Sequence, residues 1–251
     1  MDLAAYLRRI GYAGSITPTP ETLRLVHRAH LEAVPFENLD ISLGRRITVD
    51  EDAFVHKVVD ERRGGFCYEL NGAFAALLRA MGFPVTLLSA RVPTMDGSDG
   101  PEFDHLTLRV DLDHPWLADV GFGDGFLDPL LLKAGIQQKQ DHATFRITET
   151  GGVLNLERQQ PDRAWKTEYL FTLTPRRLQD FAAMCHFHQT SPESHFTQKR
   201  ICTLATPSGR ITLADMKLII TENGSRQESS APSEEERRRI LQERFGIKLK
   251  L

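Results

Sequence analysis

The stretch Arg62-Arg63-Gly64-Gly65-Phe66-Cys67-Tyr68-Glu69-Leu70-Asn71 places one cysteine where a Gly-Gly loop turns into a helix. After Cys67 the apolar residues recur at three- and four-residue spacing, and Gly82 follows as a left-handed cap. Unpaired N–H groups and the positive end of the helix dipole favour a thiolate in the first turn of a helix. The stretch therefore predicts a reactive Cys67, and the alternative is a small buried cysteine that only packs.

The bulk composition is that of a globular protein. With 251 residues, 41% of them hydrophobic, the chain is long enough for one large domain or two to three small ones. Its 31 basic and 34 acidic side chains give a formal net charge of −3, which favours neither nucleic acid nor an anionic membrane as a partner. The sequence has no run of about 18 apolar residues, so we expect no membrane-spanning helix.

The cysteines and the N-terminal residues indicate in which cellular compartment the protein is expected. Three scattered cysteines are too few for a disulfide framework: Cys67, Cys185 and Cys202. Asp2 and the pair Arg8-Arg9 stand where a secretory signal would need an apolar core. The sequence therefore predicts a reducing, cytoplasmic setting.

Two groups of soft ligands could suggest a metal. His27 and His30 are three residues apart in a predicted helix, and Cys185 lies close to His186 and His188. A structural zinc site needs four ligands, and neither group is spaced to complete one. We therefore expect no metal, and take these side chains as surface or packing residues.

The order of predicted elements is helical, then β, then mixed. We expect helices at residues 3–10, 20–33, 50–61 and 67–81, with a polar and aromatic connector at residues 34–40. Six strands should follow, at residues 85–92, 105–112, 116–120, 144–148, 153–158 and 165–173. The last part should hold a helix within residues 176–188, a hairpin around residues 207–209, a strand at 217–221, a polar gap at 222–232 and a helix from Ser233.

A histidine and an aspartate could join Cys67 in one site. His105, Thr107 and Arg109 share one face of their predicted strand, and Asp119 stands at the end of the next apolar strand. If these strands are antiparallel neighbours, Asp119 can hold one imidazole nitrogen of His105 while the other faces the thiol of Cys67. The alternatives are a satisfied core histidine and an aspartate that only forms a turn.

Four segments in the same order resemble the arylamine N-acetyltransferase family. Residues 63–71 closely resemble its active-site signature, residues 34–39 its N-terminal motif, His105-Leu106 its histidine strand, and residues 119–123 its aspartate loop. The resemblance is strong over residues 3–130 and weaker beyond, where the C-terminal part is shorter than in many relatives.

The resemblance implies a fold, a reaction and a set of roles. The fold is α+β with a cysteine-protease-like catalytic core: a helical bundle (1–83), a β-barrel domain (84–175) and a C-terminal α/β lid (176–251). Acetyl-coenzyme A would acylate Cys67, and an arylamine or arylhydrazine would then take the acetyl group in a ping-pong reaction typical of xenobiotic metabolism. His105 and Asp119 would complete the catalytic triad.

The resemblance also implies roles for residues around the triad. An apolar acceptor pocket would be lined by Phe36, Val92, Phe122 and Phe196, for each of which ordinary core packing is the alternative. Glu37 and Arg63 resemble an internal ion pair of the family. Asp124 and Asp128 lie in the loop beside this pocket, and if either carboxylate faces it, acceptors that carry a carboxylate should be disfavoured.

Other classes of protein remain possible from the sequence. A papain- or transglutaminase-like amidase would use the same three residue types, and an amide synthase of the same superfamily would cyclise a carrier-bound acyl chain. A binding module without enzymatic activity would leave Cys67 no more reactive than Cys185 or Cys202. Addition of acetyl-coenzyme A discriminates these classes, because only the transferase should become acetylated.

Overall fold

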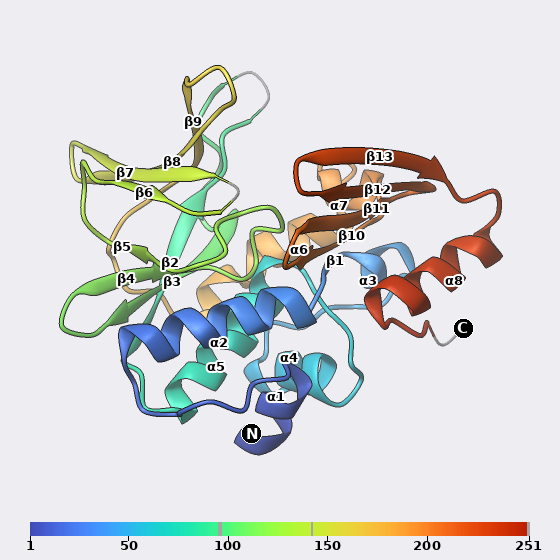
Figure 1. Cartoon of the computed structure of the whole chain (residues 1–251), viewed down its shortest axis with the longest axis horizontal. Coiled ribbons are helices and arrows are strands. Elements are labelled where there is room, and N and C mark those ends of the chain that lie inside the picture. Colours follow the sequence, from blue (N-terminus) through green and yellow to red (C-terminus); the bar gives the residue numbers. More distant parts are fainter. Residues whose placement is uncertain (95–96, 142, 250–251) are drawn as a thin grey trace.

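The computed structural model describes residues 1–94, 97–141 and 143–249. The N-terminal part is a group of helices, α1 (Leu3–Arg9), α2 (Pro20–Ala33), α4 (Glu51–Val59) and α5 (Cys67–Ala80), which lie together in the lower half of Figure 1. Every residue from Cys67 to Leu78 is buried, so α5 is the centre of the largest apolar cluster. No helix of the described residues has the length and apolar character to cross a membrane.

The helix boundaries follow the capping residues that the sequence predicts. The side chains of Thr19 and Asp50 accept hydrogen bonds from the first turns of α2 and α4. At the start of α5 the carboxylate of Glu69 accepts the N–H of Phe66 at 3.1 Å instead. Gly82, with φ of 87°, follows the last turn of α5 as expected.

The central part is an eight-stranded antiparallel sheet that curls into a nearly closed barrel (Figure 1). Its order is β5-β4-β3-β2-β9-β8-β7-β6. The strands are β2 (Val85–Arg91), β3 (His105–Asp111), β4 (Pro115–Ala118), β5 (Leu130–Leu131), β6 (Gln137–Lys139), β7 (Thr144–Thr150), β8 (Val153–Gln159) and β9 (Trp165–Phe171). The strands of this sheet contribute most residues of a second apolar cluster, and α5 packs against β3.

The C-terminal part is a five-stranded antiparallel sheet with helices. Its order is β1-β10-β11-β12-β13, and α8 (Glu234–Phe245) packs against it. The strands are β1 (Phe36–Glu37), β10 (Ile201–Thr206), β11 (Gly209–Ala214), β12 (Lys217–Glu222) and β13 (Ser225–Ser230). The 3₁₀ helix η1 (Leu178–Phe181) and the helices α6 (Ala182–Thr190) and α7 (His195–Gln198) precede β10. The predicted α+β architecture is confirmed, and the three domain boundaries stay a prediction.

Two predicted segments are wrong. The expected polar gap at residues 222–232 contains β13, an exposed edge strand held by its ladder to β12, so it has no apolar face that a pattern could reveal. The expected connector at 34–40 contains β1 and the start of α3 (Leu39–Ser42). There the side chain of Asn38 binds the carbonyls of Phe196 and Lys199 and the N–H of Ile201, contacts more than 150 residues away in sequence.

Candidate active site

Cys67 is the first residue of α5, and its side chain is buried against the start of β3. Its sulfur lies 4.0 Å from the carbonyl oxygen of Asp104, the residue before His105. The hydroxyl of Tyr68 donates to the same carbonyl at 3.1 Å and to that of Phe103 at 2.8 Å. The helix N-terminus and the histidine strand therefore meet at the thiol.

His105 and Asp119 form a buried pair. Strands β3 and β4 are antiparallel neighbours, and the Nε2 atom of His105 lies 2.6 Å from Oδ2 of Asp119. Burial raises the pKa of Asp119, but the opposing effects of His105 and of hydrogen bonds from Asn71 and Gly121 leave this pKa below its ordinary value. The carboxylate is therefore ionised, and it fixes one ring nitrogen of His105.

The thiol itself is not yet paired with His105. No hydrogen bond joins these two described residues, and burial raises the pKa of Cys67, with the nearby carboxylates of Asp104 and Asp119 acting in the same direction. The helix N-terminus alone therefore does not lower the pKa of Cys67, because desolvation outweighs the dipole. Formation of a thiolate then requires a proton acceptor next to the sulfur.

Asn71 connects the cysteine helix to the aspartate loop. Its Nδ2 atom donates to the carbonyl of Leu106 at 2.6 Å and to Oδ1 of Asp119 at 2.8 Å. Its Oδ1 atom accepts the N–H of Val120 at 2.9 Å. No role was predicted for Asn71 from the sequence, although its position one turn after Cys67 places both residues on one side of α5.

His27 supports the same loop from the opposite side, a role that was not predicted from the sequence. The Nδ1–H group of His27 donates to the carbonyl of Leu127 at 2.8 Å, so its Nε2 atom is free to accept the backbone N–H of Asp119 at 3.0 Å. The ring is fully buried and stacks on Phe126. Burial lowers the pKa of His27 to about 4, so the neutral tautomer persists at neutral pH.

This buried imidazole predicts loss of stability in mild acid. An unfolded histidine takes up a proton below pH about 6.5, whereas folded His27 stays neutral until about pH 4. Its contribution is therefore complete above pH 6.5 and is lost as the pH falls toward 4, by about 3 kcal/mol in total. Urea unfolding at pH 7 and pH 5 should show the decrease.

Substituted proteins separate His27 from other titrating groups. His27→Gln should be less stable at pH 7 and show a shallower decrease between pH 7 and 5. Part of the slope should remain, because burial also lowers the pKa of His30. His114→Gln, at an exposed site, is the matched control and should keep the wild-type slope. An unchanged slope in His27→Gln would contradict the assignment.

The four expected acceptor-pocket residues are half-buried and form two groups. Phe36 and Phe196 have ring centroids 6.2 Å apart. The ring centroids of Phe122 and His105 lie 5.2 Å apart. Phe122 and Val92 both pack against the second apolar cluster, that of the eight-stranded sheet. Phe122 is therefore the expected pocket residue with a direct contact to the His105–Asp119 pair.

The expected ion pair of Glu37 and Arg63 is confirmed. Their side chains approach to 2.7 Å, and both are buried. The N–H of Glu37 donates to the carbonyl of Gly65 at 2.8 Å, and a Cβ on Gly64 would lie 1.8 Å from the carbonyl oxygen of Pro35. The pair therefore supports the glycine loop that leads to Cys67.

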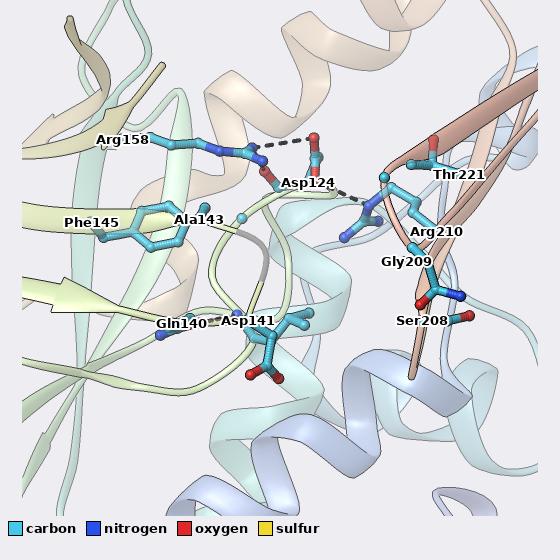
Figure 2. Close-up of a pocket in the computed structure, with 14 residues that line it drawn as sticks. Asp124, Gln140, Asp141, Ala143, Phe145, Arg158, Ser208, Gly209, Arg210 and Thr221 are labelled. Carbon is cyan, nitrogen blue, oxygen red and sulfur yellow. Dashed lines mark hydrogen bonds and ion pairs between the residues drawn. The ribbon is translucent and has the colours of Figure 1, made fainter. Parts of the chain in front are cut away.

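The two carboxylates of the loop after Asp119 both face arginines. Asp124 lies between Arg158 and Arg210 at 3.3 and 3.1 Å, and Figure 2 shows this arrangement. Asp128 receives two hydrogen bonds from Arg28, at 3.0 and 2.8 Å. Each of the two carboxylates therefore faces at least one guanidinium group, which opposes the repulsion of carboxylate-bearing acceptors that the loop sequence suggested. Among the described residues no group of three or more metal-ligating side chains is found.

Comparison with known proteins gives matches over the whole chain. A family model described as N-acetyltransferase matches residues 19–251. The chain is 35% identical to an arylamine N-acetyltransferase / N-hydroxyarylamine O-acetyltransferase of Salmonella typhimurium, covering 98% of this chain and 88% of the relative. It is also 35% identical to arylamine N-acetyltransferase 1 of Homo sapiens, covering 99% and 95%.

Solved structures agree with these matches. The arylamine N-acetyltransferase of Mycobacterium smegmatis superposes with a TM-score of 0.92 at 34% identity, covering 99% of this chain and 93% of that one. The enzyme of Mycobacterium marinum in complex with CoA gives a TM-score of 0.91 at 32% identity, covering 98% and 93%. On this sequence and structural similarity, the chain is an acyltransferase that belongs to the arylamine N-acetyltransferase family.

Proposed function

We propose that the protein transfers an acetyl group from acetyl-coenzyme A to the nitrogen of an arylamine or arylhydrazine through an acetyl-Cys67 intermediate. The buried His105–Asp119 pair at the N-terminus of the Cys67 helix is the observation that carries the proposal. Its other supports are the names of the relatives and the CoA complex of the Mycobacterium marinum protein.

The hydrogen bonds of the pair support a chemical role for each group. Because Asp119 occupies Nε2 of His105, that nitrogen carries the proton and Nδ1 is the acceptor left for the thiol. Nδ1 takes the proton of Cys67, the thiolate attacks the thioester carbonyl, and coenzyme A leaves as a thiol with the proton from His105. The acceptor amine then attacks acetyl-Cys67, its proton passes to His105, and the released thiolate recovers it.

The setting of the site agrees with this chemistry. Phe36, Phe122 and Phe196 would offer an apolar surface to a planar aromatic acceptor. The three cysteines of the chain are free and buried, as suits the reducing cytoplasm that we infer.

Intact-protein mass spectrometry after mixing with acetyl-coenzyme A tests the proposal directly. Wild type should gain one acetyl group, lose it on addition of an arylamine such as aniline, and form the N-acetyl product. Cys67→Ala should gain none. A wild type that stays unmodified while hydrolysing amides would support the amidase, and one that accepts only a carrier-bound acyl chain would support the amide synthase.

The thiolate can be tested separately by alkylation. With His105 as the proton acceptor, Cys67 should react with iodoacetamide below pH 7 as an imidazolium-paired thiolate. In His105→Gln the counter-charge is lost, and because burial raises the thiol pKa, the inflection should move above about 8.5. A single inflection near 8.5 or higher in wild type would contradict the ion pair. The alkylation rates of Cys185 and Cys202 give the comparison for buried thiols that have no base beside them.

A further inference from the structure

A row of three charges spans the barrel and the five-stranded sheet. Figure 2 shows Arg158 of β8, Asp124 of the loop after Asp119, and Arg210 of β11 in this order. Arg158 also donates to the backbone carbonyl of Asp124 at 3.1 Å, and Arg210 donates to the hydroxyl of Thr203 at 3.2 Å. We call these three residues the arginine–aspartate triplet.

The triplet lies beside two hollows that share a wall, and all three of its residues line the first of them. The first has a volume of about 540 Å³ and extends between the barrel and the turns of the C-terminal sheet, where Ser208 and Thr221 offer hydroxyl groups. The second, of about 640 Å³, shares Asp124 and Arg158 with the first and extends to Phe122. Phe122 lines the second hollow and its ring also contacts that of His105, so a single side chain separates this hollow from the candidate active site.

The charges of the triplet do not balance. Two guanidinium groups share one carboxylate, and the carboxylate is the exposed member: its side chain is 64% exposed, against 24% for Arg158 and 16% for Arg210. Each arginine gives Asp124 one side-chain nitrogen, and within the described part of the chain Nη2 of either arginine has no hydrogen-bond acceptor. Burial and the charge of Arg158 lower the pKa of Arg210, while Asp124 opposes them, so a second anion would be stabilised there.

We propose that the arginine–aspartate triplet is an anion-binding subsite, in which Asp124 occupies the place that an anionic group of a substrate takes when it binds. This inference rests on the proposed acetyl transfer and names a substrate class for it. A carboxylate or a phosphate suits the site, because a guanidinium binds either group through two parallel N–H bonds. The effect on carboxylate-bearing acceptors is then opposite to the repulsion that the loop sequence alone suggested.

Two substrates could supply the anion, and the two half-reactions distinguish them. If a carboxylate on the acceptor binds, the deacetylation of acetyl-Cys67 by 4-aminobenzoate should depend on the arginines, and deacetylation by aniline should not. If a phosphate of the acyl donor binds, acetylation of Cys67 by acetyl-coenzyme A should depend on them, and acetylation by the uncharged thioester S-acetyl-N-acetylcysteamine should not.

The variants are Arg158→Gln and Arg210→Gln, each with its lysine counterpart, together with Asp124→Asn. Each glutamine variant should lower the rate constant for the anionic substrate by about tenfold, as expected for one partly exposed charged hydrogen bond. The lysine variants should recover part of that loss. Asp124→Asn should raise the same rate constant by a few-fold, since it removes the competing carboxylate. Arg79→Gln, which breaks the surface ion pair with Glu51 outside both hollows, is the matched control and should keep the wild-type ratio of anionic to neutral substrate.

The ratio of anionic to neutral substrate decides the proposal. A decrease of this ratio in both glutamine variants, in either half-reaction, supports the subsite and identifies which substrate supplies the anion. An unchanged ratio in both half-reactions overturns the proposed subsite. A lower ratio of anionic to neutral substrate in Asp124→Asn also overturns it. If the wild type transfers no acetyl group with the neutral substrates, the proposed function is overturned instead. The two failures are therefore distinguishable.

Discussion

Asp119→Asn is expected to reduce acetyl transfer by about 10⁴-fold while the protein stays folded. Wild-type Asp119 accepts hydrogen bonds at both carboxylate oxygens. Oδ1 receives the side-chain amide of Asn71 and the N–H of Gly121, and Oδ2 faces Nε2 of His105. An asparagine must keep its oxygen toward the two fixed donors, so its NH₂ group would point at His105.

That orientation selects the wrong tautomer of His105. Nε2 would accept a hydrogen bond from the amide, so the ring proton would lie on Nδ1, the nitrogen that should receive the proton of Cys67. The variant also loses the negative charge that stabilises an imidazolium. Both losses act on the same step, which is why an isosteric change of one atom is expected to have so large an effect.

Single-turnover acetylation and thermal unfolding should be measured together. Asp111→Asn, at the end of β3 and paired with Arg109 at the surface, is the matched control and should lose less than about threefold. If folded Asp119→Asn keeps most of its acetylation rate, Asp119 serves only to form the turn before Gly121.

Much of this site could be predicted because its residues are adjacent to strong local signals. Cys67 follows a glycine pair and opens an amphipathic helix, while His105 and Asp119 lie on consecutive strands whose antiparallel pairing brings them together. Each prediction depends on contacts within one helix or between two neighbouring strands. Periodicity and turn chemistry encode such contacts directly.

The residues that sequence analysis missed act across long separations. His27 binds the backbone of Asp119 from 92 residues away, and Arg210 meets Asp124 from another sheet. Nothing in the local pattern around His27 distinguishes a buried hydrogen-bonding imidazole from a packing residue. The raised pKa of Cys67 has the same origin, because burial depends on the whole fold whereas the helix dipole can be inferred from a short stretch.

Gly121→Ala is expected to reduce acetyl transfer by about 10²-fold without loss of any catalytic side chain. Gly121 is buried between the aspartate loop and the first turn of α5. A Cβ at this position would lie 2.8 Å from Cα and 2.9 Å from the carbonyl oxygen of Cys67, and 2.7 Å from Nδ2 of Asn71. Two of these atoms are backbone of a buried helix, so a rotamer change cannot relieve the contact.

The loop must therefore move away from α5, and it carries Asp119 with it. A displacement of about 1 Å between the His105–Asp119 pair and Cys67 is enough to lower the rate by that factor. Gly125→Ala provides the steric comparison in the same loop, because its Cβ would come no closer than 3.4 Å to Phe122. Transfer should fall far less in Gly125→Ala, and iodoacetamide should still alkylate Cys67 in both variants. Equal rates in the two alanine variants would show that close packing of the aspartate loop on α5 does not position the reacting groups.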